Sequence, residues 1–118
     1  MTHPLFRNAA AHADGFRDVD PLLLSEHLGG THLVDVREPG EYVGELGHIQ
    51  GTELVPLATV ASRAAGWARD EEVVVICRSG GRSAQAARAL VAMGFTRVIN
   101  LRGGMNAWNQ AHLPTVRS

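Results

Sequence analysis

The stretch VVVICRSGGRSAQAARAL, from Val73 to Leu90, joins an apolar run to a helix-like pattern through a glycine-bearing loop. The apolar run before Cys77 is typical of a parallel strand that is buried on both faces. The alanine-rich segment after the loop predicts a helix that ends at Gly94. The stretch is therefore a strand, a loop and a helix, and the only cysteine of the chain stands at the first junction.

The rest of the chain alternates in the same way. Short apolar runs predict further strands at 16–19, 31–36, 52–57 and 97–101. Helical patterns cover 21–28, 58–68 and 103–112, and a long loop with at most one helical turn around Glu41 covers 37–51. Strands and helices that alternate at this spacing predict an α/β domain with a parallel sheet and helices on both of its faces.

Composition fits one domain and excludes several classes of protein. The chain has 118 residues, 45% of them hydrophobic, which is enough for a core without disulfides or a structural metal. The net charge is −1 and all 11 basic residues are arginines spread along the chain, so no nucleic-acid partner is expected. A single cysteine excludes an internal disulfide and a zinc-type spacing, which favours a reducing compartment.

The N-terminal segment has neither the charged nor the apolar region of a signal peptide, and no run of about 18 apolar residues occurs. We therefore expect a cytoplasmic protein without a membrane partner. Residues 1–14 are small and polar, and we expect them to form a flexible extension before a single domain over 15–118.

Cys77 lies where parallel sheets bind their ligands, at the carboxyl end of a strand. Six residues after it are expected to bind substrate, namely Arg78, Ser79, Gly80, Gly81, Arg82 and Ser83. Their glycines permit positive φ, so backbone N–H groups can turn inward to form an anion-binding cradle at a helix N-terminus. The same field favours thiolate over thiol, which makes Cys77 a candidate nucleophile. The alternative is a buried strand-end cysteine between two solvated arginines, and the glycine-bearing loop argues against it.

Four segments occur in the order typical of one protein family. They are the cysteine loop at 77–83, LVDVREPGEY at 33–42, GHIQGTELVPL at 47–57 and LRGGMNAWNQAHLPT at 101–115. Together, over about residues 16–115, they resemble the rhodanese-type sulfurtransferases. The resemblance implies one rhodanese-like domain with a five-stranded parallel sheet flanked by helices on both faces.

The resemblance also implies a thiosulfate sulfurtransferase-like enzyme with Cys77 as its sulfur carrier. Cys77 takes a sulfane sulfur from thiosulfate or a related persulfide donor and passes it to a thiol, cyanide or protein acceptor, in a double displacement. No metal and no organic cofactor is expected. Because the chain has one cysteine, an outside molecule has to resolve the Cys77 persulfide.

Other signature residues are assigned mainly to structure. The resemblance suggests structural hydrogen bonds and an ion pair for Asp35, Arg37 and His48, with pocket lining as the alternative. The sequence departs from the family at Gln50, where proline is usual, and at Arg102, where an acidic or neutral residue is common. We expect Gln50 to change only loop stiffness, and Arg102 to lie near the pocket mouth and favour an anionic donor or an acidic partner surface.

Two other functions stay open. A cysteine-dependent phosphatase or arsenate reductase uses the spacing Cys-x5-Arg, whereas Cys77 and Arg82 are spaced Cys-x4-Arg, and the tighter loop favours a sulfur over a tetrahedral oxyanion. A non-catalytic rhodanese-like module that binds or regulates a partner often lacks the cysteine, which this chain has.

Overall fold

Five parallel strands and one antiparallel edge strand form the sheet of this computed structural model, which describes residues 4–12 and 14–117. The strands are β1 (Ala10–Ala11), β2 (Arg17–Val19), β3 (His32–Asp35), β4 (Glu53–Leu54), β5 (Glu72–Ile76) and β6 (Arg97–Leu101). Their order is β1-β2-β6-β5-β3-β4, and only β1 runs antiparallel to its neighbour. The expected parallel strands are confirmed, but the expected count of five omitted β1.

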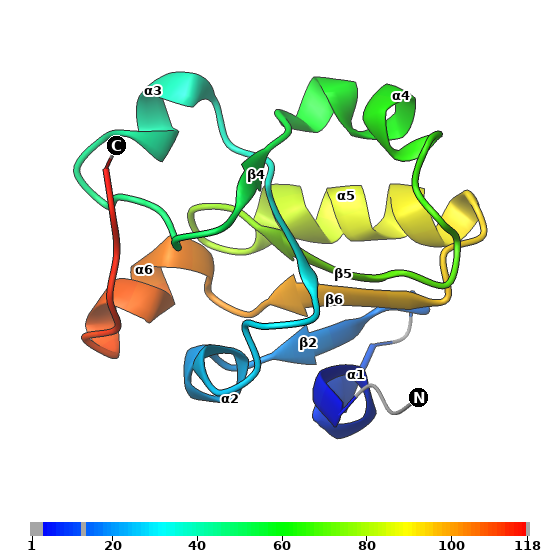
Figure 1. Cartoon of the computed structure of the whole chain (residues 1–118), viewed down its shortest axis with the longest axis horizontal. Helices are drawn as coiled ribbons and strands as arrows, with labels where there is room; N and C mark the ends of the chain where they lie inside the picture. The colour runs from blue at the N-terminus through cyan, green and yellow to red at the C-terminus, as the bar shows by residue number, and fades with distance from the viewer. Residues whose placement is uncertain (1–3, 13, 118) are drawn as a thin grey trace.

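Helices cover both faces of the sheet, as the sequence predicted (Figure 1). On one face lie α4 (Val60–Ala64) and α5 (Gly81–Ala92), and on the other α1 (Pro4–Asn8), α2 (Pro21–Ser25) and α6 (Gly104–Gln110). The 3-10 turn η1 (Leu57–Thr59) leads into α4, and α3 (Pro39–Tyr42) is the single helical turn expected in the long loop. Within the described residues, every helix is too short or too polar to span a bilayer.

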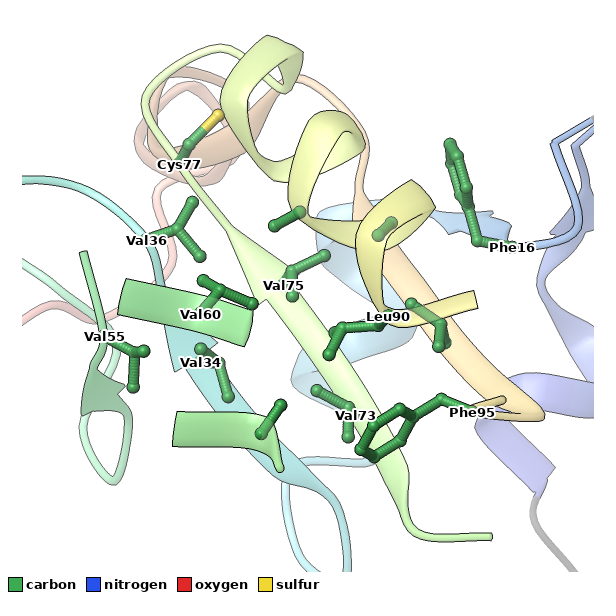
Figure 2. Close-up of a cluster of buried hydrophobic side chains, with 14 residues drawn as sticks. Phe16, Val34, Val36, Val55, Val60, Val73, Val75, Cys77, Leu90 and Phe95 are labelled. Atoms are coloured by element: carbon green, nitrogen blue, oxygen red, sulfur yellow. The ribbon is translucent and has the colours of Figure 1, made fainter. Parts of the chain in front are cut away.

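Alternation along β5 divides the core into two layers. Val73, Val75 and Cys77 point into the layer beneath α4 and α5, where Figure 2 shows Cys77 at the end of the strand. Val74 and Ile76 point into the opposite layer, against α1, α2 and α6. Because side chains alternate with a period of two, this register aims the Cys77 side chain towards the start of α5.

Residues 4–12, which belong to the predicted extension over 1–14, pack against the sheet. Leu5 is 1% exposed and belongs to the core layer shared by α1, α2 and α6. The Phe6 N–H donates to Glu72 at 3.2 Å, and Arg17 donates to the Phe6 carbonyl at 2.9 Å. A few apolar side chains therefore anchor this segment, although most of its residues are small. Residues 1–3 and 13 of the expected extension lie outside the described residues.

Candidate functional site

Cys77 is held at the carboxyl end of the central strand β5, directly before the loop that enters α5. Its side chain is 1% exposed. The Gly80 N–H donates to Sγ at 3.0 Å, and the Ser83 hydroxyl lies 3.2 Å from the same sulfur. The sulfur therefore faces hydrogen-bond donors of its own loop, as the cradle expected from the sequence requires.

The loop turns back on the sulfur because Gly80 has a φ of 107°, a conformation that residues with a side chain rarely adopt. Gly81 differs from the expectation, since it is the first residue of α5 and is not among the glycines with positive φ. One glycine therefore makes the turn and the other begins the helix. At 12 residues α5 is long enough for its N-terminal dipole to favour a negative charge at Cys77.

Two opposing effects set the pKa of the Cys77 thiol. Burial, the largest single effect, raises the pKa because it penalises the thiolate. Hydrogen bonds from the Ser83 hydroxyl and from the N–H groups of Ser83, Gly80 and Ser79 act in the other direction, and together they bring the pKa below its ordinary value. The environment therefore favours the nucleophilic form of Cys77.

The start of α6 holds the cysteine loop from its other side, a role that sequence reasoning did not assign. The N–H of Met105 donates to the Cys77 carbonyl at 2.8 Å, and the N–H of Asn106 donates to the Arg78 carbonyl at 2.9 Å. Gly104 permits this approach, because a Cβ there would lie 2.4 Å from the Cys77 carbonyl oxygen. The signal in the sequence was the Gly103-Gly104 pair between a strand and a helix.

Arg82, near the start of α5, forms an ion pair with Glu41, which lies in α3 of the long loop. The two guanidinium nitrogens donate to the two carboxylate oxygens at 2.7 and 2.8 Å. This hydrogen bonding from Arg82 is the main reason that the pKa of Glu41 falls to about 2. Arg82 was expected to bind substrate, but the structure places its guanidinium on a carboxylate of the protein. Glu41 therefore ties the long loop to the cysteine loop.

A cleft of about 260 Å³ opens beside the cysteine loop. Its lining consists of Arg37, Gly40, Glu41, Gly44, Glu45, Leu46 and Arg78. Arg78, the residue that follows Cys77, brings a positive charge to this cleft. The long loop over 37–51 thus supplies most of the wall of this cleft, whereas Cys77 itself is not among the lining residues described.

Asp35 and Arg37 form a buried ion pair that fastens the wall of the cleft. Arg37 donates to the Asp35 carboxylate through Nε at 2.9 Å and through Nη2 at 2.8 Å. The same Nη2 also donates to the Gly47 carbonyl at 2.8 Å. Within the loop, His48 Nδ1 lies 2.7 Å from the Tyr42 carbonyl, so that nitrogen carries the proton of the bond. Asp35, Arg37 and His48 thus make hydrogen bonds and an ion pair of the kind that the resemblance suggested, and Arg37 also lines the cleft, which was the alternative.

Arg102 follows β6 and faces β2. Its guanidinium lies 4.0 Å from an Asp18 oxygen and 3.5 Å from an Asp20 oxygen, with the side chain 56% exposed. It is not among the described residues that line the cleft beside Arg78. The carboxylates of Asp18 and Asp20 therefore hold the Arg102 guanidinium near β2. In the part of the chain that the structure describes, no three His, Cys, Asp or Glu side chains are grouped as metal ligands.

Comparisons with known proteins agree with this geometry. The family model of the rhodanese-like domain matches residues 20–111. A sulfurtransferase from Allochromatium vinosum is 39% identical over 102 residues, which cover 84% of this chain and 94% of that protein. The thiosulfate sulfurtransferase GlpE of Pseudoalteromonas translucida is 34% identical over 80 residues, which cover 68% of this chain and 74% of that protein.

Other relatives are longer, and the matches span between 40% and 60% of the length of three of them. Among solved structures, a rhodanese-related protein from Thermoplasma volcanium superposes with a TM-score of 0.79 at 28% identity. That superposition covers 87% of this chain and all of the other. The match to the family model includes strands β3 to β6 and the cysteine loop.

Proposed function

The chain belongs to the rhodanese-like domain family, and from this premise we propose that it moves a sulfane sulfur from thiosulfate or a related persulfide donor to a thiol, cyanide or protein acceptor. Sulfurtransferases among its relatives support sulfur transfer in general. The proposal names Cys77 as the residue that carries the sulfur, and the cysteine loop as the site that receives the donor.

The observation that carries the proposal is the convergence of hydrogen-bond donors on the Cys77 sulfur. Gly80 donates to it from the backbone, and the Ser83 hydroxyl stands within reach. Donors arranged in this way stabilise a negative sulfur before any substrate arrives, as in a preorganised oxyanion site. A thiolate is the form of cysteine that attacks another sulfur atom.

The reaction has two displacements. The Cys77 thiolate attacks the outer sulfur of thiosulfate, the sulfur–sulfur bond of the donor breaks, and sulfite leaves with the bonding electron pair. The outer sulfur stays on Cys77 as a persulfide. An acceptor thiolate or cyanide then attacks this terminal sulfur, and the Cys77 thiolate leaves and is ready for the next cycle. A thiol acceptor gives its proton to solvent before it attacks.

Arg78 is proposed to bind the anionic donor. It follows Cys77 directly and lines the cleft of about 260 Å³, so its charge stands where a sulfonate group can approach the site. Backbone N–H groups of residues 78–83 are proposed to hold the terminal sulfur once it is transferred. The proposed compartment is the cytoplasm, where a lone cysteine stays reduced.

Mass spectrometry of the intact protein tests the proposal. Brief incubation with thiosulfate, followed by desalting, is expected to leave a protein heavier by one sulfur atom, and cyanide is expected to return it to its starting mass. The control is Cys77→Ser, which should fold and gain no mass. A wild-type protein that gains no sulfur, with a Cys77 alkylation midpoint near that of a free thiol, indicates a non-catalytic module instead. Turnover of an aryl phosphate without sulfur loading indicates a phosphatase.

A further inference from the structure

A row of polar side chains runs inward from the surface of β2 to the Cys77 sulfur. Asn100 lies in β6 and is 5% exposed, although its neighbours in the strand are apolar. Its Oδ1 lies 2.5 Å from the Ser83 hydroxyl, and its Nδ2 donates to Asp18 Oδ1 at 3.0 Å. Ser83, itself fully buried, connects Asn100 to Cys77. A polar residue in such a place needs a reason other than packing.

The Ser83 hydroxyl has one proton and three acceptors within reach. The Cys77 sulfur and the Gly80 carbonyl each lie at 3.2 Å, whereas the Asn100 oxygen lies at 2.5 Å. The proton therefore cannot serve the sulfur and Asn100 at the same time. The shortest contact is the one to Asn100.

Asp18 determines which end of the Asn100 amide faces Ser83. A carboxylate only accepts hydrogen bonds, so the atom that touches Asp18 has to be the amide nitrogen. The amide oxygen is then left facing Ser83, where it can only accept as well. Asn100 consequently competes with the sulfur for the Ser83 proton and cannot supply one.

We propose that Asn100 is a positioning residue that holds the Ser83 hydroxyl back from the Cys77 sulfur and so limits the stabilisation of the thiolate. The inference rests on the proposed function and deepens it. A thiolate loses nucleophilicity as its basicity falls, and the best attacking thiol is one that is half ionised near the working pH. Competition from Asn100 keeps the sulfur reactive enough to attack a donor.

Apart from Asp18, which accepts a bond from the Asn100 amide, the charges near Cys77 in the described residues, including Arg78 at the cleft, are not bonded to Asn100. Arg82 is paired with Glu41 across the loop, and Arg37 is paired with Asp35 beneath the long loop. On the β2 side, Asp18 and Asp20 face Arg102. A neutral replacement at position 100 leaves all of these charges in place, so its effect on the sulfur reports on the Ser83 hydroxyl.

The test is the pH dependence of Cys77 alkylation by iodoacetamide, followed by mass, in Asn100→Leu. Leucine is similar in size to asparagine and has no oxygen, so the Ser83 proton is left to the sulfur and the Gly80 carbonyl, and the sulfur receives it more often than in wild type. The midpoint is expected to fall by about half a pH unit to one pH unit, the effect of one hydrogen bond. In a Ser83→Ala background the same substitution should produce no shift. A rise, no change, or an equal fall in both backgrounds would overturn the proposal.

A second pair of variants keeps the proposal testable if Asn100→Leu does not fold. Asp18→Asn removes the carboxylate that orients the amide, and Asp20→Asn removes a neighbouring carboxylate that also faces Arg102. We expect Asp18→Asn to lower the alkylation midpoint more in the wild-type background than in the Ser83→Ala background. Asp20→Asn should show no such difference between the two backgrounds. Equal behaviour of the two variants would contradict the proposal. Alkylation reads the thiol directly, so this result stands apart from whether the protein accepts sulfur from thiosulfate.

Discussion

The two ends of the parallel sheet carry polar clusters of opposite kinds. At the carboxyl end, the Cys77 sulfur meets an N–H group of the backbone and a hydroxyl, and no carboxylate bonds to it among the described residues. At the amino end, the His32 ring lies between two carboxylates, with Nδ1 2.6 Å from Glu71 and Nε2 2.7 Å from Glu53. Arg63 pairs with Glu53 at that same end.

The difference shows how one sheet separates reactivity from stability. The polar side chains at the amino end are hydrogen-bonded or ion-paired with one another, so their electrostatic field has little effect on a ligand. The donors at the carboxyl end come largely from the backbone of the loop that Gly80 turns back, and they face a sulfur atom that can lose its proton. The four predictions below test this contrast, beginning with the largest effect.

Gly104→Ala is expected to destabilise the protein most. Its φ of 57° disfavours a side chain, and an added Cβ would lie 2.4 Å from the Cys77 carbonyl oxygen and 2.6 Å from the Arg78 carbonyl carbon. Strain and overlap together predict a loss of about 2–5 kcal/mol in the free energy of unfolding, measured by urea denaturation. Sulfur loading should fall as well, because the loop has to move.

Gly30→Ala is the matched control at the amino end of the sheet. Gly30 also has a positive φ, 84°, but an added Cβ there has no atom within 4 Å. Its cost should be limited to the backbone strain, about 1–2 kcal/mol, with sulfur loading unchanged. Equal costs for the two variants would mean that the contact between α6 and the loop does not constrain the site.

His32→Gln tests the cluster at the amino end. The imidazole loses two carboxylate contacts and an edge contact with Trp67 at 4.5 Å, and we expect a cost of about 1–2 kcal/mol on thermal or urea unfolding. The rate of sulfur transfer should stay within about twofold of the wild-type rate, because we expect a substitution at this distance to change the activation free energy by only a few tenths of a kcal/mol. His27→Gln, which loses one contact to a carbonyl, is the control. A large loss of activity would show that the two ends are coupled.

The sequence predicts those features of the fold and the site that depend on residues close together in the chain. The apolar run before Cys77 indicated a central strand, and the loop after it placed donors at the carboxyl end of that strand, as found. Pro39 to Tyr42 formed the single turn expected in the long loop. Each of these follows from neighbouring residues that determine their own backbone conformation.

The features that were missed depend on residues far apart in the chain. Glu41 and Arg82 are 41 positions apart, and Asn100 meets Asp18 across 82 positions, so no spacing rule connects them. The strand β1 has two residues and is defined only by its pairing with β2. The pairing of Arg102 with two aspartates is likewise visible only once β2 lies beside β6.

Arg78→Gln is expected to weaken donor binding at the carboxyl end. Arg78 lines the cleft, so loss of its charge should raise the KM for thiosulfate by about 3-fold to 10-fold and leave kcat nearly unchanged, which is the pattern for lost uniform binding. Arg102→Gln removes the same charge from an exposed side chain paired with β2, and its KM should change little. Equal rises would assign the effect to net charge and not to the cleft.

Glu41→Gln has the smallest expected effect, and pH gives it a signature. Hydrogen bonding from Arg82 lowers the pKa of Glu41 from 4.5 to about 2, so the unfolded chain takes up the proton first as pH falls. The stabilisation is therefore complete above about pH 4.5 and is lost as pH falls towards 2. Both side chains are about one-third exposed, so screening limits the difference between Glu41→Gln and wild type to about 1 kcal/mol or less at neutral pH.

Urea denaturation of both proteins at a series of pH values measures this difference, which should shrink steadily between about pH 4.5 and pH 2. Glu45→Gln is the control, because Glu45 lines the same cleft and its carboxylate has no ion pair among the described residues. Its difference from wild type should stay near zero throughout. If the Glu41→Gln difference instead stayed constant with pH, the loss would come from packing of α3. The ion pair between Glu41 and Arg82 would then contribute no more to the free energy of unfolding than an ordinary solvated carboxylate does.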